Sequence, residues 1–314
     1  MFRTTVRKSI AVVASLSLVV GLTACNRDSG TTASSDGKSI TFALSTQTNP
    51  FFVQLRAGAE EKAEELGVTL NIQDASDDST TQVNQLSNAT TTGSGVVIVN
   101  PTDSDAIVPA VESLNAANIP VVAVDRSANG GEIASYIASD NIAGGSQAAK
   151  VLAEAIGGEG EILILQGIAG SSASRDRGNG FETGLQEFPN VKIAAKQTAN
   201  FDRTKGLDVA TNLLQAHPNV KAIFAENDEM ALGAVEALGD RAGKDVLVVG
   251  FDGTKDGLAA IADGRMLATI AQQPEKLGSR AVEEAAKLLK GESATKEVPV
   301  EVITVTKENL VEFQ

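Results

Sequence analysis

Several residue types are scarce in this 314-residue chain: tryptophan is absent, and tyrosine, histidine and cysteine occur once each. One cysteine excludes a disulfide within the chain, and one histidine with one cysteine excludes His/Cys metal clusters. Only an all-oxygen metal site stays open, and no spaced Asp/Asn loop ending in glutamate suggests one. The sole histidine, His217, follows a predicted helix and precedes a proline, so a surface turn explains it better than catalysis. We expect neither a metal nor a cofactor.

Positive charge is also in short supply. The chain has 26 lysines and arginines against 40 aspartates and glutamates, which gives a net charge of -14. The first 24 residues carry Arg3, Arg7 and Lys8 and no acid, so their removal would take the net charge from -14 to -17. Such an acidic balance argues against nucleic acid or an anionic lipid surface as a partner of the folded part.

The N-terminal stretch has the composition of an export signal. Three basic residues precede an uncharged, mostly apolar run at 9–24 that is too short for a permanent membrane span, so we predict a signal peptide over residues 1–24. The run ends in Leu-Thr-Ala before Cys25, which resembles the bacterial lipobox. The resemblance implies cleavage before Cys25, acylation of its sulfur and anchoring in the bilayer on the extracytoplasmic face of the cell membrane. The alternative is a cysteine that merely follows a signal segment. Residues 25–38, rich in Ser, Thr, Gly and Asp after Cys25, are predicted to form a lipidated, flexible tether.

From Ile40 onward, strand and helix patterns alternate in two consecutive series of roughly 100 to 130 residues. This predicts an α/β protein with two doubly wound parallel-sheet lobes. A helix after residue 272 and a last strand at about 300–305 have no place in the second series, so we expect the chain to return to the first lobe and cross a hinge several times. The expected lobes are 39–139 plus 273–302, the N-terminal lobe, and 140–272 plus 303–314, the C-terminal lobe. Smaller expectations are a helix capped by Asp103 or Ser104, a helix beginning near Gly178, and a strand at 191–195.

The strand predicted at Val121–Val124 runs directly into Asp125 and Arg126. Ligands of open α/β sheets bind beyond the carboxyl ends of the strands, so this charged pair is aimed at a site. Asp125 offers two acceptor oxygens and Arg126 five donors in a rigid fork, which together suit a polyhydroxyl compound. The alternative is that Asp125 caps the next helix and Arg126 lies in solvent.

Other predicted strands end in the same mixture of planar polar groups and aromatic rings. Sugars need this mixture, because their hydroxyls take Asp, Asn, Gln and Arg while their C–H faces stack on rings. For each phenylalanine taken alone, packing in a core is the favoured interpretation, and only the polar neighbours favour a site. Of Arg175 and Arg177, two residues apart in a predicted loop, one is expected to be solvated. The candidate ligand-binding residues are Asn49, Phe51, Phe52, Asp125, Arg126, Arg177, Phe201, Asn227, Asp252 and Gln272.

These residues lie in motifs that closely resemble those of the D-ribose-binding proteins of bacterial ABC importers, from about Ile40 to the C-terminus. The resemblance implies a type I periplasmic binding protein fold, a monomer, and a closed form that an ABC permease recognises. It also implies that Phe51, Phe52 and Phe201 enclose the pyranose ring while the polar residues bind its hydroxyls from both lobes. One extra residue between Phe181 and Phe201 departs from the family pattern and leaves the register of the strand at 191–195 open. The motifs are Asn49-Pro50-Phe51-Phe52, Asn100-Pro101-Thr102-Asp103, Val124-Asp125-Arg126, Ala138-Ser139-Asp140-Asn141, Leu165-Gln166-Gly167, Asn200-Phe201-Asp202-Arg203, Asn227-Asp228-Glu229-Met230 and Phe251-Asp252-Gly253.

Three other functions compete with ribose capture. The first is binding of another sugar, such as allose or a furanose-type signal molecule. The second is transcriptional regulation by the same two lobes, which needs a DNA-binding helix pair where this chain has a signal segment. The third is an enzyme, but no nucleophile–base pair is evident and the Gly-rich piece at 157–160 does not follow a strand as a phosphate loop would. We therefore expect a binding protein and not an enzyme.

Overall fold

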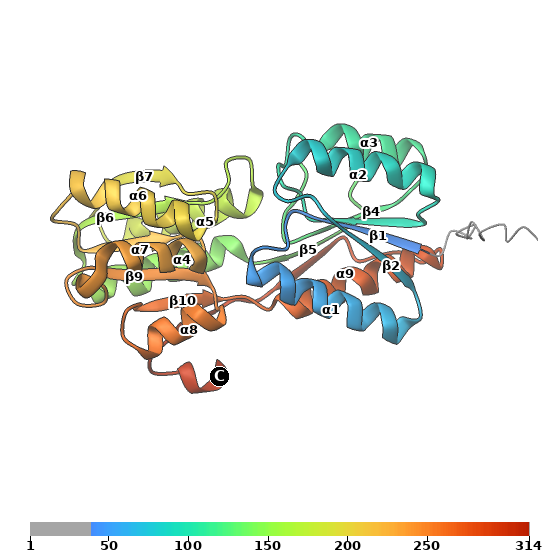
Figure 1. Cartoon of the computed structure of the whole chain (residues 1–314). Helices are drawn as coiled ribbons and strands as arrows, with labels where there is room; N and C mark the ends of the chain where they lie inside the picture. The colour runs from blue at the N-terminus through green and yellow to red at the C-terminus, as the bar shows by residue number, and fades with distance from the viewer. Residues whose placement is uncertain (1–38, 314) are drawn as a thin grey trace, which may run out of the picture. The chain divides into compact units, whose positions relative to one another are not determined.

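The computed structural model describes residues 39–313, which form two six-stranded sheets, each with helices on both faces (Figure 1). In the first sheet the strand order is β11-β5-β4-β3-β1-β2, and all neighbours are parallel. Helices α1 and α9 pack together on one face, and α2 and α3 on the other. The strands are β1 (Ser39–Leu44), β2 (Thr69–Asp74), β3 (Val96–Val99), β4 (Val121–Val124), β5 (Ser135–Ser139) and β11 (Glu297–Val300), and the helices are α1 (Pro50–Leu66), α2 (Ser79–Thr92), α3 (Val108–Ala116) and α9 (Pro274–Leu289).

The second sheet repeats the plan in the order β12-β10-β9-β8-β6-β7, with β12 antiparallel at its edge. Helices α4 and α5 pack together, as do α6 and α7, and α8 packs against α7. The strands are β6 (Glu159–Gln166), β7 (Asn190–Thr198), β8 (Ala222–Ala225), β9 (Leu247–Asp252), β10 (Ala268–Ala271) and β12 (Ile303–Thr306), and the helices are α4 (Asn141–Ala155), α5 (Ser172–Gly184), α6 (Arg203–Ala216), α7 (Asp228–Leu238) and α8 (Lys255–Ala262), with 3-10 turns η1 (Leu185–Glu187), η2 (Gly239–Arg241) and η3 (Leu310–Phe313). The predicted fold class, two doubly wound lobes, is confirmed.

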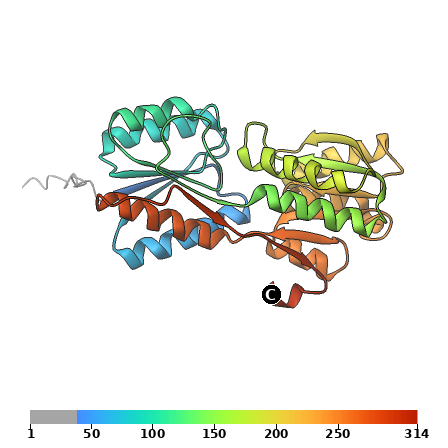
Figure 2. The same cartoon turned by 180° about the vertical axis from the view of Figure 1, so that it is seen from behind.

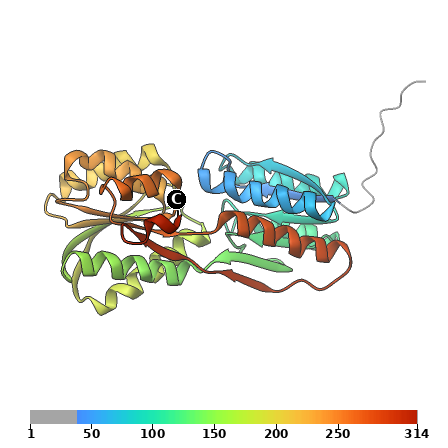
Figure 3. The ribbon, with the colours of Figure 1, turned by 90° about the horizontal axis from the view of Figure 1, so that it is seen from below.

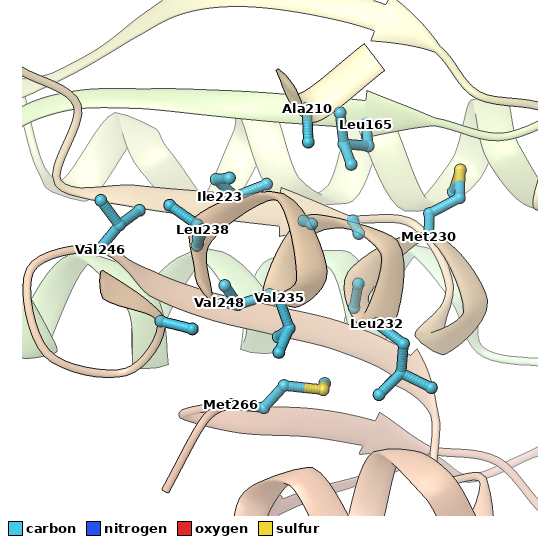
Figure 4. Close-up of a cluster of buried hydrophobic side chains, with 14 of the residues drawn as sticks. Leu165, Ala210, Ile223, Met230, Leu232, Val235, Leu238, Val246, Val248 and Met266 are labelled. Atoms are coloured by element: carbon cyan, nitrogen blue, oxygen red, sulfur yellow. The ribbon is translucent and has the colours of Figure 1, made fainter. Parts of the chain in front are cut away.

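The central strands β3, β4 and β8 are buried on both faces, which explains their short uninterrupted apolar runs. Figure 4 shows one of the resulting cores, in which side chains of α7 such as Val235 and Leu238 pack with Ile223 of β8 and Val248 of β9. Fully burying one such side chain contributes about 1.5–3 kcal/mol. The cores hold the strands rigidly, so the residues at the strand ends keep fixed positions.

Three chain segments join the sheets: β5 to α4, β10 to α9, and β11 to β12. Figures 2 and 3 show the consequence for α9, which lies beside α1 although 207 residues separate the end of α1 from the start of α9 along the chain. The single last strand expected at 300–305 is wrong. The chain instead forms β11 in the first sheet, leaves it at Glu301 and Val302, and enters the second sheet as β12.

Two expected helix starts are also wrong. The helix expected near Gly178 begins at Ser172, so Arg175 and Arg177 lie on α5 and not in a loop. Within α5, Gly180 serves helix packing, because a Cβ there would lie 2.1 Å from the carbonyl oxygen of Ile142 in α4. The helix expected after Asp103 begins only at Val108, with no side-chain cap.

The register left open at 191–195 is now defined. Ile162 of β6 pairs with Ile193 of β7, while the next residue, Leu163, pairs with Ala195. Ala194 is therefore the additional residue of a bulge in β7.

The predicted signal peptide, Cys25 and the tether lie outside the described residues. Within residues 39–313, no helix combines the length and the apolar character that a membrane span requires. The same residues contain no group of three or more His, Cys, Asp or Glu side chains placed to hold a metal ion.

Candidate sugar-binding site

The carboxyl ends of the strands from both sheets meet at one cavity. All ten residues predicted from the sequence line it, together with Ala173 from the first turn of α5, which no sequence pattern singled out. Asn49, Phe51, Phe52, Asp125 and Arg126 belong to the part of the chain that forms the first sheet, and Arg177, Phe201, Asn227, Asp252 and Gln272 to the part that forms the second. The structure thus brings the whole predicted set together.

Asp125 and Arg126 stand at the end of β4, both almost fully buried. Nε of Arg126 lies 3.6 Å from Oδ2 of Asp125. Asp125 has a φ of 63°, a left-handed conformation that costs a residue with a side chain of this kind about 1 kcal/mol or more. The alternative that Asp125 caps a following helix is wrong, because irregular chain and then β5 follow β4.

Asn100, at the end of β3, fixes Asp125 from behind. Its Nδ2 donates to Oδ2 of Asp125 at 3.2 Å and to the carbonyl oxygen of Val124 at 3.1 Å. Its Oδ1 accepts from the backbone and hydroxyl of Ser45 at the end of β1. Asn100 is completely buried and does not line the cavity, so it holds three neighbouring strand ends in register around the aspartate.

The aromatic wall of the first lobe begins α1. Asn49 is the N-cap of this helix, and its Oδ1 accepts from the backbone N–H of Phe51 at 2.9 Å. The cap fixes the first turn, on which Phe51 and Phe52 meet edge to face with ring centres 5.0 Å apart. Both residues are only 3–4% exposed.

In the second lobe, Arg177 is the most heavily constrained side chain of the cavity. Its Nε donates to Oδ1 of Asn141 at 2.8 Å, and its Nη1 donates to the carbonyl oxygen of Glu226 at 2.7 Å. Nη1 also lies 3.6 Å from Oδ1 of Asp252, and the guanidinium lies 3.9 Å from the centre of the Phe251 ring. The guanidinium therefore has a single defined orientation toward the cavity.

Phe201, Asn227, Asp252 and Gln272 complete this half. Asn227 is the N-cap of α7, and its Nδ2 donates to the carbonyl oxygen of Phe201 at 3.2 Å. Gln272 donates from Nε2 to Oδ1 of Asp252 at 2.7 Å. Phe201 has a φ of 59°, and Asp252 a φ of 131°, so both site residues hold strained backbone conformations. Strain kept at several residues of one cavity is typical of a preorganised binding site.

Three buried polar atoms of cavity residues have no hydrogen-bond partner among the described residues: Oδ1 of Asp125, Nε of Arg126 and Oε1 of Gln272. Burying such atoms unpaired costs about 1–3 kcal/mol each. They offer acceptors and a donor, which a group that both donates and accepts, such as a sugar hydroxyl, can satisfy. The cavity itself has a volume of about 20 Å³, room for about one water molecule, so a sugar enters only if the walls move apart.

The charges in the cavity balance, with two carboxylates and two guanidinium groups. Burial raises the pKa of Asp125, an effect that the neighbouring Arg126 and Arg177 partly offset. Burial likewise raises the pKa of Asp252 well above its ordinary value and lowers the pKa of Arg126. Each charge is costly here and is retained because a partner of opposite sign lies beside it. A neutral, hydroxyl-rich ligand fits this balance better than an ion.

The chain is similar to known proteins along most of its length. The family model for the periplasmic binding protein domain matches residues 40–293. The ribose import binding protein of Escherichia coli (strain K12) is 46% identical over 269 residues, covering 86% of this chain and 90% of that protein. The protein of the same name from Bacillus subtilis (strain 168) is 45% identical over 298 residues, covering 93% and 96%.

Solved structures agree with this fold. A solute binding protein of an ABC transporter from Actinobacillus succinogenes 130z, with bound D-allose, superposes with a TM-score of 0.82 at 35% identity and covers 87% of this chain and 99% of that one. The myo-inositol binding protein of Caulobacter, bound to myo-inositol, gives a TM-score of 0.85 at 33% identity with coverage of 88% and 96%.

Proposed function

The chain belongs to the periplasmic binding protein family, and we propose that it captures D-ribose between its two lobes and delivers it to an ABC permease. The observation that carries the proposal is the single cavity lined by all ten predicted residues. Its walls combine three phenylalanine rings with two ion pairs and three side-chain amides. The similarity to two ribose import binding proteins, at 46% and 45% identity, supports ribose over other sugars.

The mechanism follows from the division of the cavity between the lobes. A sugar that contacts residues of both lobes has far higher affinity for the closed form than for the open form, so it shifts the equilibrium toward closure. Closure removes water from the ion pairs, which strengthens each hydrogen bond to a hydroxyl and penalises a hydroxyl that is missing or inverted. The permease then recognises the closed form. On this proposal the lobes are 39–139 plus 273–302 and 140–272 plus 303–314, and the protein acts as a monomer without catalysing a reaction.

Another sugar is the second candidate. Related structures hold D-allose and myo-inositol, so cavities of this build accept other polyols. One calorimetric titration series separates the candidates. We expect D-ribose to bind at one site per chain and more tightly than D-allose, myo-inositol or D-arabinose, without any turnover. If one of the other sugars binds more tightly, that sugar replaces D-ribose as the proposed ligand. If none of the sugars binds, the proposal is rejected.

We further propose that Cys25 is acylated and holds the protein on the extracytoplasmic face of the membrane. The support is the lipobox-like ending of the predicted signal segment in the sequence. In the native host, the wild-type chain is expected in the membrane fraction and the Cys25→Ala variant in the soluble fraction or still attached to its uncleaved signal. Equal membrane binding of a Cys25→Ala variant with its signal removed would contradict acylation.

A further inference from the structure

Glu226 is a completely buried residue at the end of β8 that does not line the sugar cavity, although its neighbour Asn227 does. Oε2 of Glu226 accepts from the backbone N–H of Gly167 at 2.7 Å and from the hydroxyl of Ser174. Gly167 directly follows β6, and Ser174 lies in the first turn of α5. One carboxyl oxygen therefore joins two strand ends and a helix.

The same residue also holds Arg177 through its main chain. Arg177 lies three residues after Ser174 and so on the same face of α5, one turn on. Its Nη1 donates to the backbone carbonyl oxygen of Glu226 at 2.7 Å. The side chain of Glu226 thus fixes the position of α5, and the carbonyl of Glu226 fixes the guanidinium that α5 carries into the cavity.

A second cavity residue depends on the Gly167 contact. The ring of Phe201 lies against Gly167 so closely that a Cβ there would be 2.1 Å from Cζ of Phe201. The carbonyl oxygen of Gly167 also accepts from the hydroxyl of Thr198 at the end of β7. The hydrogen bond to Glu226 therefore sets the position of Gly167, and Gly167 in turn sets the position of the Phe201 ring.

We propose that Glu226 is a positioning residue of the sugar site, which holds Arg177 and Phe201 in place without touching the sugar. The inference rests on the proposed function, since it concerns binding at the same cavity. Displacing a contacting group by about 1 Å weakens a multi-point interaction strongly, so loss of this support is felt in affinity. A merely structural residue would instead lower stability and leave the affinity of the folded protein unchanged.

The surroundings of the carboxyl group show which substitution preserves its role. Charged groups face it from two elements, Arg177 on α5 and Lys196 on β7, and Lys196 is itself paired with Glu182 at 2.7 Å. Burial outweighs these charges and raises the pKa of Glu226 to about 7. Protonated or not, Oε2 can accept both hydrogen bonds. The carbonyl oxygen of a glutamine can do the same, whereas alanine leaves the N–H of Gly167 and the hydroxyl of Ser174 unpaired.

The first test is calorimetric titration of D-ribose into the whole folded protein. Glu226→Ala should weaken binding about 10- to 100-fold, while Glu226→Gln should stay within about threefold of wild type. Glu236→Gln, on the exposed face of α7, is the matched control and should not change affinity. An affinity of Glu226→Ala within threefold of wild type would overturn the positioning role alone, whereas wild-type protein that binds no sugar would overturn the proposed function with it.

The second test is a double-mutant cycle on affinity. If Glu226 acts through Arg177, adding Glu226→Ala to Arg177→Met should lower the affinity for D-ribose much less than the same substitution does in the wild-type background. When Glu226→Ala is added to Phe52→Ala in the first lobe, it should weaken D-ribose binding by the same factor as in the wild-type background. If Glu226→Ala weakens binding by the same factor in the Arg177→Met and Phe52→Ala backgrounds, the inference is overturned. Should Glu226→Ala not fold, Ser174→Ala removes one of the same hydrogen bonds and goes through the same cycle, with a smaller factor of about 3 to 10 expected.

Discussion

The guanidinium carbon of Arg126 lies 5.3 Å from the ring centre of Phe201, although the two residues follow strands of different sheets. The same guanidinium lies 5.1 Å from the ring centre of Phe52 in its own lobe. One cation is therefore in cation–π contact with aromatic rings from both lobes. Because these groups line the cavity as well, the contacts that close the lobes and the contacts offered to a sugar belong to the same side chains.

Asp125→Ala should abolish tight D-ribose binding while leaving the fold intact. The change removes two acceptor oxygens from the cavity and leaves Arg126 without its partner, so we expect affinity to fall by about 100-fold or more. Titration calorimetry measures the affinity, and circular dichroism with thermal unfolding checks the fold. A folded variant that binds ribose almost as well as wild type would contradict the assignment of Asp125 to the site.

The sequence was sufficient to predict the fold class and to select residues that the structure brings to one cavity. Both successes have the same physical origin: buried parallel strands are short apolar runs, and the residue after each run lies at the same edge of its sheet. Asp125, after the run at 121–124, shows this directly. That these residues bind a sugar stays a prediction.

The residues that sequence reasoning missed act through neighbours that only the folded chain defines. Asn100 and Glu226 support the cavity because β3 lies between β1 and β4, and β8 lies between β6 and β9. Ala173 lines the cavity with a methyl group, which carries no signal in a sequence. Gly180 permits the close approach of α4 and α5, a tertiary feature that only the folded chain shows.

Hydrogen bonds outside the cavity join the lobes, and one of them can be removed by a single substitution. The backbone N–H of Ser127 donates to the hydroxyl of Ser172 at 2.9 Å, and that of Ser104 donates to the carbonyl oxygen of Gly170 at 3.1 Å. None of these four residues lines the sugar cavity. Ser172→Ala should lower the population of the closed form, and the affinities for D-ribose and for a weaker sugar should then fall by the same factor, about 3 to 10.

The ratio of the two affinities is the decisive quantity for Ser172→Ala, measured by calorimetry with D-ribose and D-allose. A site residue such as Asp125 changes this ratio, whereas a contact that only favours closure leaves it constant. Ser87→Ala, on the exposed face of α2, is the control and should leave both affinities unchanged. A changed ratio in Ser172→Ala would place the residue among the sugar contacts instead.

The carboxyl group of Glu226 should make stability depend on pH. Burial raises its pKa from 4.5 to about 7, so the folded protein binds the proton more tightly than the unfolded chain does. The resulting stabilisation is complete below pH 4.5 and is lost as the pH rises through about 7. Over this interval the free energy of unfolding of wild type should fall by about 3 kcal/mol relative to Glu226→Gln, which cannot titrate. Urea unfolding of both proteins at pH 4.5, 6 and 7.5 measures the difference. If the free energy of unfolding changes with pH in the same way for both proteins, burial does not raise the pKa of Glu226.

Gly167→Ala tests whether the position of the Phe201 ring controls binding. A Cβ at residue 167 would lie 2.1 Å from Cζ of Phe201, and the backbone behind it is held by Glu226, so the ring has to move. The ring is only partly buried, so the displacement should cost little stability but weaken D-ribose binding about 10-fold or more. In a Phe201→Leu background, where the ring is already gone, the added methyl group should cost no more than about twofold. An equal loss in both backgrounds would show that Gly167 affects the site through the main chain and not through the ring.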